Sequence, residues 1–216
     1  IIFVQVALTN GLGKSIQEIM KPSAEGAKKY DTATFYSISN CQEGLSRVTL
    51  GNFLIKRVVF EIQEELPNIK NFGTLSPIPG FRDWFSYLED GKIKNILGNI
   101  PIENISFLKS PDLKPGDPRI VSNKDALLKL VSHYLMNEKN HKQLPINDVC
   151  RFHLGNGAII DDIIVNANVS EVGLNRSFGV MVNYLYELKN IEKNHEDYIN
   201  NKKIIVSDKV KKLFNF

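Results

Sequence analysis

Two polar side chains, Ser76 and His153, are of types that carry out acid–base or nucleophilic chemistry. Ser76 follows a strand that the pattern predicts over Ile69–Leu75, and α/β folds usually bind ligands at the carboxyl ends of their strands. Pro77 and Pro79 restrict the backbone around the Ser76 hydroxyl, which suits a preorganised site. A serine before a proline is also an ordinary helix N-cap. Spacing alone therefore favours a helix N-cap at Ser76 over a catalytic role, and does not exclude the catalytic role.

His153 lies in a segment whose alternation predicts a hairpin. The first strand covers Asp148–Leu154, the turn is Gly155-Asn156-Gly157, and the second strand covers Ala158–Asn166. Alternation places His153 on the face opposite Phe152. A single strand histidine is more often structural than catalytic. The four histidines of the chain also lack the spacing of metal ligands, so no metal site is expected.

A third candidate site precedes a helix predicted over Asn52–Leu66 and stopped by Pro67. A helix N-terminus exposes unpaired N–H groups, and a glycine before it lets a phosphate approach the backbone. The segment that would hold a pyrophosphate consists of Ser46, Arg47, Val48, Thr49, Leu50, Gly51 and Asn52. It lacks the Gly-rich fingerprints of dinucleotide folds and P-loops. On spacing alone, an ordinary loop with a capping glycine is favoured.

The remaining elements give a mixed α/β fold. Strands are expected at Ile2–Leu8 and Thr32–Ser39, and helices at Ser15–Met20, around Trp84, and at Asn123–Asn137; Gly179–Leu188 is a strand or a helix. Gly91–Gly116, rich in Gly, Pro, Asn and Lys, is expected to be the least structured stretch and a surface insertion.

Composition narrows the classes of function. The 216 residues suffice for one well-buried domain. A net charge of +3 is too small to argue for nucleic acid, and no apolar run is long enough to span a bilayer. The cysteines are Cys41 and Cys150, neither in a CxxC pair, which argues against a disulfide framework and a zinc site.

Several blocks of the sequence strongly resemble the malonyl-CoA decarboxylase family. They are, in order, Ala33–Ser39, Gln42–Leu45, Leu50–Val59, Leu75–Phe81, Arg151–Ala158 and Met181–Tyr186. The resemblance runs from the first strand to near the end of the chain. It is weakest between Gly91 and Ile120, where this chain is shorter than members of the family.

The resemblance implies a GNAT-like acyltransferase fold, with a central mixed sheet flanked by helices. Residues 1–216 would then form a catalytic domain, a fragment without its start and without a preceding helical domain used for assembly, and 91–120 would be a variable surface insertion. The full-length protein is expected to be a homo-oligomer, with no nucleic-acid or membrane partner. We expect it in the cytoplasm, or in the mitochondrial matrix or peroxisome of a eukaryote, although the chain ends in Phe216 without a Ser-Lys-Leu signal.

By the same resemblance, Ser76 and His153 are the catalytic pair and Ser46–Asn52 binds the coenzyme A moiety of malonyl-CoA. Asn183 and Tyr184 are lesser candidates for lining the acyl pocket. Thr49 stands where some members carry an acidic residue, so a role for that carboxylate does not transfer. No cofactor is expected, because the thioester carbonyl is itself the electron sink. His153 suits the protonation of the product because an unperturbed imidazole titrates near physiological pH.

Two other classes of function stay open. A GNAT-fold acyltransferase would move an acyl group from coenzyme A to an amine, and would need an acceptor channel and a base. A non-catalytic sensor would bind malonyl-CoA and never turn it over. Release of CO2 from malonyl-CoA without any acceptor separates a decarboxylase from both.

Overall fold

The computed structural model describes residues 2–21, 29–40 and 51–213. The chain divides into two compact units, each built from segments that alternate along the sequence. Unit 1 comprises Ile1–Ser76, Phe152–Ile159 and Asn183–Ile205, and unit 2 comprises Pro77–Arg151, Ile160–Val182 and Val206–Phe216. Ser76 and His153 both belong to unit 1.

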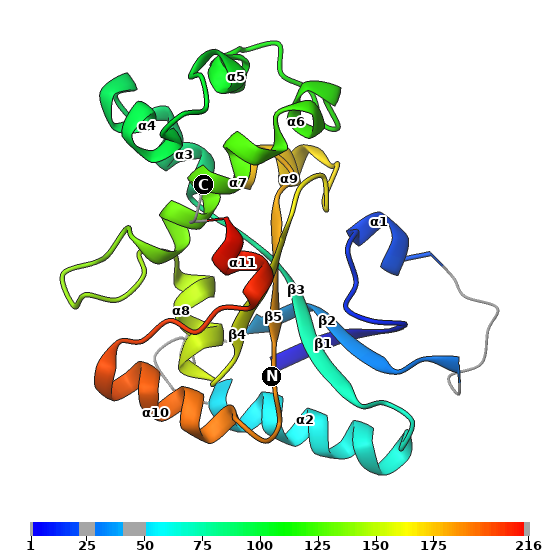
Figure 1. Ribbon diagram of the computed structural model, residues 1–216. Coiled ribbons are helices and arrows are strands. Elements are labelled where there is room, and N and C mark those ends of the chain that lie inside the picture. The colour runs from blue at the N-terminus through cyan, green and yellow to red at the C-terminus, as the bar shows by residue number, and fades with distance from the viewer. Residues whose placement is uncertain (1, 22–28, 41–50, 214–216) are drawn as a thin grey trace. The chain divides into compact units, whose positions relative to one another are not determined.

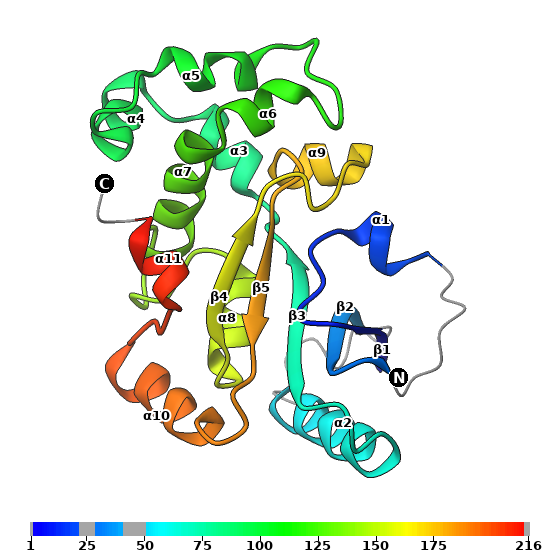
Figure 2. The same ribbon diagram turned by 45° about the vertical axis from the view of Figure 1, so that its right-hand side comes forward.

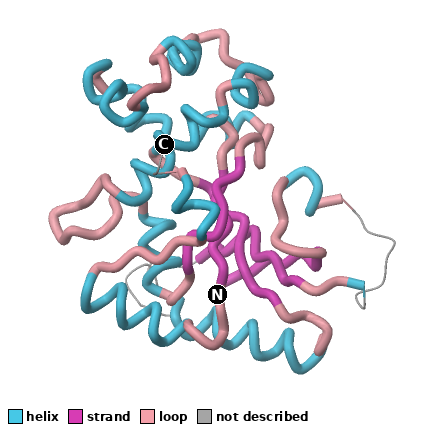
Figure 3. Tube along the Cα trace, viewed as in Figure 1, coloured by secondary structure: helices cyan, strands magenta, loops and turns pink. Residues whose placement is uncertain are grey.

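The strands form one mixed sheet, drawn in magenta in Figure 3. They are β1 (Ile2–Thr9), β2 (Thr32–Asn40), β3 (Asn71–Pro77), β4 (Ile159–Ile164) and β5 (Met181–Leu185), in the order β1-β2-β3-β5-β4. β1 pairs antiparallel with β2, and β2 pairs parallel with β3. The mixed α+β architecture, with helices beside a mixed sheet, is confirmed. The segment 179–188, left open as strand or helix, contains β5.

Helix α2 (Gly51–Glu65) makes the crossover between the parallel strands β2 and β3 (Figure 1). Its inner face carries Ile55 and Val59, which are buried at i, i+4 spacing. Arg57 pairs with Glu61 at 3.1 Å on the exposed face. The predicted helix over this segment is therefore confirmed. The helix predicted over Ser15–Met20 is also confirmed, and α1 covers Ile16–Ile19 of it.

Unit 2 is mainly helical. Its helices are α3 (Phe81–Ser86), α4 (Asp90–Leu97), α5 (Glu103–Ser106), η3 (Phe107–Lys109), α6 (Pro118–Ser122), α7 (Lys124–Met136), α9 (Glu171–Ser177) and α11 (Asp208–Lys212). α7 contacts α4, α5 and α6, as Figure 2 shows. Helix α10 (Ile191–Asn201) belongs to unit 1.

The prediction that Gly91–Gly116 has little regular structure is wrong. α4, α5 and η3 occupy much of it, and their inner side chains Ile93, Leu97, Ile105 and Leu108 are buried. The glycines and prolines that suggested a loop lie mostly between short helices, where they end one and allow the next. Whether 91–120 varies as an insertion stays a prediction.

The predicted strand over Asp148–Leu154 is also wrong, because this segment is helix α8 (Asp148–Gly155). Cys150 and Leu154 are buried at i, i+4 spacing, and His153 lies on the same inner face at i+3. Alternation of Cys150, Phe152 and Leu154 suggested a strand, but two of these residues also fit a helical stripe.

The segment Gly155-Asn156-Gly157 closes helix α8 instead of forming a hairpin turn. Ala158 N donates to the His153 carbonyl at 3.1 Å, and Gly157 N donates to the Leu154 carbonyl at 3.0 Å. These two bonds are those of a Schellman motif, with Gly157 at its left-handed position (φ 78°). A Cβ there would lie 2.1 Å from the Ile191 carbonyl oxygen, so only glycine fits.

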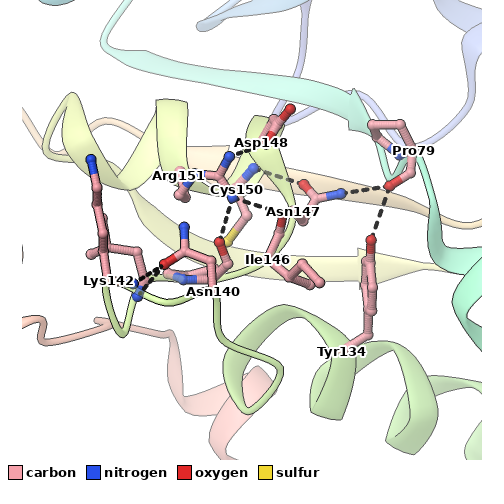
Figure 4. A network of polar contacts seen from close by, with 11 residues as sticks. Pro79, Tyr134, Asn140, Lys142, Ile146, Asn147, Asp148, Cys150 and Arg151 are labelled. Atoms are coloured by element: carbon pink, nitrogen blue, oxygen red, sulfur yellow. Dashed lines mark hydrogen bonds and ion pairs between the residues drawn. The ribbon is translucent and has the colours of Figure 1, made fainter.

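The start of α8 is held by a polar network within unit 2 (Figure 4). Asn147 Oδ1 accepts from Cys150 N at 2.8 Å, which caps the helix. Asn147 Nδ2 donates to the Pro79 carbonyl at 2.9 Å, and the Tyr134 hydroxyl donates to the same oxygen at 3.2 Å. The Arg151 guanidinium donates to the carbonyls of Pro145 and Ile146. The network fixes the first turn of α8.

Candidate active site

Ser76 lies near the end of β3, in a strand that is buried on both faces. Thr74 precedes it by two residues, so the two side chains lie on the same face of the strand. Ser76 Oγ donates a hydrogen bond to Thr74 Oγ1 at 2.9 Å. Only 6% of Ser76 and 1% of Thr74 are exposed, which places the serine hydroxyl in a dry environment.

His153 reaches this hydroxyl from helix α8. Its Nε2 lies 3.0 Å from Ser76 Oγ, although the two residues are 77 positions apart. Its Nδ1 lies 2.8 Å from the hydroxyl of Tyr186, directly after β5. The ring also stacks on Tyr184, with 4.4 Å between centroids and 24° between planes. The structure therefore brings Ser76 and His153 into contact, with both ring nitrogens of the histidine engaged.

Burial sets the charge state of the pair. Desolvation lowers the pKa of His153 from its usual 6.5 to about 3. Burial also raises the pKa of Tyr186 well above 10, so this phenol keeps its hydrogen. His153 is therefore a neutral imidazole at physiological pH. The suitability inferred from its unperturbed pKa was wrong, because burial disfavours the imidazolium.

The lowered pKa of His153 predicts a loss of stability in acid. Above about pH 6.5 the histidine is neutral in both the folded and the unfolded chain, so it adds no pH dependence. Below that value the unfolded chain binds a proton that folded His153 does not take up until about pH 3. The free energy of unfolding should therefore fall by about 2 kcal/mol from this group between about pH 7 and pH 5. Urea unfolding at both pH values measures it.

The control is His153→Asn, which removes only this titration. The pKa of the part-buried His133 is also lowered by burial, so wild type and variant share its contribution. Their difference isolates His153. Equal pH slopes in the two proteins would show that His153 titrates normally in the folded chain.

The other predicted site residues are Ser46–Asn52, Asn183 and Tyr184, and the structure describes only some of them. Ser46–Leu50 lies outside the described residues, while α2 begins at Gly51, one residue before the predicted start at Asn52. Asn183 is buried, and its Nδ2 donates to the carbonyls of Gly13 (3.0 Å) and Thr74 (2.8 Å). Tyr184 is buried against His153. Contact of Asn183 and Tyr184 with an acyl group stays a prediction.

Sequence reasoning missed Thr74 and Tyr186 as members of the site. Each lies two residues from a side chain that was singled out, Thr74 before Ser76 and Tyr186 after Tyr184. Strand alternation places such i, i+2 residues on one face. That signal was available for both, but it applies to many residues and does not by itself select these two.

No group of three or more His, Cys, Asp and Glu side chains among residues 2–21, 29–40 and 51–213 is arranged to hold a metal ion. In the same part of the chain, every helix is too short or too polar to cross a membrane.

Comparison with known families gives one consistent answer. The family model described as malonyl-CoA decarboxylase C-terminal domain matches residues 1–216. The mitochondrial malonyl-CoA decarboxylase of Anser anser anser is 37% identical over 232 residues, covering 97% of this chain and 46% of that protein. The protein of the same name from Mus musculus is 36% identical, with 97% and 47% covered. The chain thus spans about half the length of the curated relatives it matches.

Solved structures agree. A crystal structure of malonyl-CoA decarboxylase from Rhodopseudomonas palustris has a TM-score of 0.89 and 39% identity, covering 98% of this chain and 49% of that one. The enzyme of that name from Agrobacterium vitis has a TM-score of 0.86 and 37% identity, with 98% and 53% covered.

Proposed function

Because this chain belongs to the malonyl-CoA decarboxylase family, we propose that it releases CO2 from malonyl-CoA and leaves acetyl-CoA. The observation that carries the proposal is the buried contact between Ser76 Oγ and His153 Nε2 at 3.0 Å. This contact supplies a hydroxyl and an imidazole that can act on the same substrate group. The relatives named above are malonyl-CoA decarboxylases.

The reaction makes three demands on the protein. The malonyl carboxylate must be held out of the plane of the thioester, so that the breaking C–C bond overlaps the carbonyl. The enolate oxygen needs hydrogen-bond donors as charge develops there. The carbon that loses CO2 must then receive a proton. The thioester carbonyl accepts the electron pair of the broken bond, so the chemistry requires no metal, biotin or pyridoxal.

We assign the proton to His153. A thioester enolate is a stronger base than imidazolate, so a neutral imidazole N–H is a competent acid towards it. Nε2 is the nitrogen that faces Ser76, and Tyr186 holds the opposite nitrogen at 2.8 Å. After Nε2 has given up its hydrogen, the Tyr186 hydroxyl donates to Nδ1 of the strongly basic imidazolate, and one proton taken up from solvent restores the phenol and the imidazole to their starting state. A buried, neutral ring thus supplies a proton without first gaining charge.

We assign Ser76 to the acyl group, where its hydroxyl donates to the thioester carbonyl or to the carboxylate. Burial of Ser76 and His153 strengthens either contact, because water does not compete there. Asn183 and Tyr184 are proposed to line the acyl pocket beside them. Nucleophilic attack by Ser76 is unnecessary, since decarboxylation needs no covalent intermediate.

Coenzyme A is proposed to bind at Ser46–Asn52, with its pyrophosphate on the amides at the start of α2. Gly51→Val should then block close approach of the phosphates, raising KM strongly and lowering kcat as the acyl end loses its anchor. Steady-state kinetics of the folded variant measure both. An unchanged KM would remove this segment from the binding site.

The proposed chemistry predicts independence from metals and vitamin-derived cofactors. Turnover of malonyl-CoA should persist after exhaustive EDTA treatment and dialysis, at the rate of the untreated protein. Activity that disappears with the chelator and returns with one defined metal would show that the electron sink is not the thioester alone.

Incubation with malonyl-CoA in the absence of any amine distinguishes the classes of function. A decarboxylase gives acetyl-CoA, measured by mass spectrometry of the thioesters. An acyltransferase leaves malonyl-CoA intact until an acceptor is added. A sensor binds malonyl-CoA, measured by calorimetry, and leaves it unchanged with or without an acceptor.

Assembly of the full-length protein as a homo-oligomer and a cytoplasmic location stay proposals. The relatives from Anser anser anser and Mus musculus are mitochondrial by name, so the matrix is the alternative compartment.

A further inference from the structure

Ser76 Oγ donates to Thr74 Oγ1, whereas the donor in its contact with His153 Nε2 depends on the tautomer of the imidazole. The distance of 2.9 Å is that of an ordinary hydroxyl–hydroxyl bond. Thr74 is 1% exposed, so this bond does not compete with water. The hydroxyl hydrogen of Ser76 is therefore committed to Thr74 in the substrate-free protein.

Thr74 is itself held on both its side chain and its backbone. Its Oγ1 also accepts from the Tyr184 amide at 3.3 Å, and its carbonyl accepts from Asn183 Nδ2 at 2.8 Å. The same Asn183 nitrogen donates to the Gly13 carbonyl, which anchors the asparagine. These bonds tie the acceptor of the Ser76 hydrogen to strand β5.

Counting hydrogens then fixes the tautomer of His153. A serine hydroxyl has one hydrogen, and Thr74 receives it. The hydrogen in the 3.0 Å contact between Ser76 Oγ and His153 must therefore come from Nε2. A neutral imidazole carries one hydrogen, so Nδ1 has none and accepts from the Tyr186 hydroxyl at 2.8 Å.

We infer that Thr74 is a positioning residue in the substrate-free protein: it accepts the Ser76 hydrogen, keeps it away from His153 and thereby keeps the imidazole protonated on Nε2 until the acyl group replaces Thr74 as the acceptor. This inference rests on the proposed function for its consequence, since Nε2 is the nitrogen assigned to the acyl end. Without the Thr74 hydroxyl, Ser76 is free to donate to Nε2. The ring then carries its hydrogen on Nδ1, which faces Tyr186. Nε2, the nitrogen assigned to the acyl group, then has no hydrogen to donate.

Nitrogen-15 NMR of histidine-labelled protein tests the tautomer directly, since the shifts of the two ring nitrogens distinguish N–H from bare nitrogen. The His153 signals are assigned by their absence in His153→Asn. We expect His153 to be protonated on Nε2 in the wild type. Thr74→Val should move the hydrogen towards Nδ1, and Thr74→Ser, which restores the hydroxyl, should return it to Nε2.

Kinetics on malonyl-CoA give the second readout. Thr74→Val should lower kcat about tenfold, the effect of one lost hydrogen bond, with KM unchanged. Thr74→Ser should recover most of that loss. Thr32→Val is the matched control, because Thr32 is an equally buried strand threonine whose described side-chain hydrogen bond is donated to Asp31, away from Ser76 and Asn183. It should lose stability but keep both the tautomer and kcat.

A wild-type spectrum with the hydrogen on Nδ1 overturns the inference, and so does a Thr74→Val spectrum that still shows it on Nε2. If Thr74→Val fails to fold, the wild-type spectrum and Thr74→Ser decide the question. The NMR readout needs no turnover. A protein that is inactive on malonyl-CoA would therefore refute the proposed function while leaving the role of Thr74 to be judged on its own evidence.

Discussion

Replacing His153 with asparagine is expected to lower kcat for malonyl-CoA decarboxylation by about two to four orders of magnitude, the usual contribution of a general acid. The enolate formed by loss of CO2 then has no proton donor at the position of Nε2, which lies 3.0 Å from Ser76 Oγ in the wild type. Binding should be largely retained, because the coenzyme A contacts are proposed to lie at Ser46–Asn52. Steady-state kinetics together with calorimetric binding of malonyl-CoA measure both quantities.

Folding of the His153 variant is the necessary control. Asparagine is smaller than histidine and leaves the Tyr186 hydroxyl without its partner, so the variant must be shown to unfold cooperatively before its kinetics are interpreted. A folded His153→Asn that keeps more than about a tenth of wild-type kcat has lost too little for a general acid. The proton would then come from Tyr184 or from water.

The substitution Ser76→Ala is expected to have the second large effect on kcat. Combining it with His153→Asn shows whether the two residues act on the same transition state. The single variant should lose about two to three orders of magnitude in kcat, as when a donor to a developing oxyanion is removed. If Ser76 and His153 act on one transition state, the double variant should be little slower than the poorer single variant. The three variants and the wild type form a double-mutant cycle.

Additive losses in that cycle would separate the two residues. A double variant slower than either single variant by the full product of their effects means that Ser76 and His153 contribute independently, despite their hydrogen bond. The matched control is Ser37→Ala, a serine on strand β2 that pairs with Gln5 and lies outside the proposed site. It should leave kcat unchanged.

Elements with a long, regular pattern of apolar residues could be predicted from the sequence. α2 has its buried side chains at a regular helical spacing and ends before a proline, and α7 has the same kind of stripe. β2 is rich in β-branched and aromatic residues, which favour strands. In these segments local preference and tertiary burial agree, so a single sequence is sufficient.

Helix α8 could not be predicted because its pattern fits two periods. Cys150 and Leu154 are four apart, which satisfies both a strand and a helix, and eight residues are too few to decide. The deciding contacts are tertiary. Asn147 caps the helix while also bonding Pro79, and Gly157 fits against Ile191. No local pattern reports a partner so distant in sequence.

The contact between Ser76 and His153 agrees with the resemblance, their catalytic roles stay predictions, and the electrostatics of the pair could not be predicted. The family resemblance named Ser76 and His153, and the structure places them in contact. The pKa of His153 depends on how completely the folded chain buries the ring, which composition and spacing do not give. Tyr186 and Thr74 matter through the atoms they bond, and only a folded arrangement shows which atoms those are.

The most direct test is decarboxylation of malonyl-CoA in deuterium oxide, without any acyl acceptor, followed by mass spectrometry of the thioesters. We expect acetyl-CoA and CO2 in equal amounts, with one deuterium in the acetyl methyl group at early times, and loss of this product in His153→Asn. Malonyl-CoA that stays intact until an amine is added, or that is bound and never converted, would contradict this expectation.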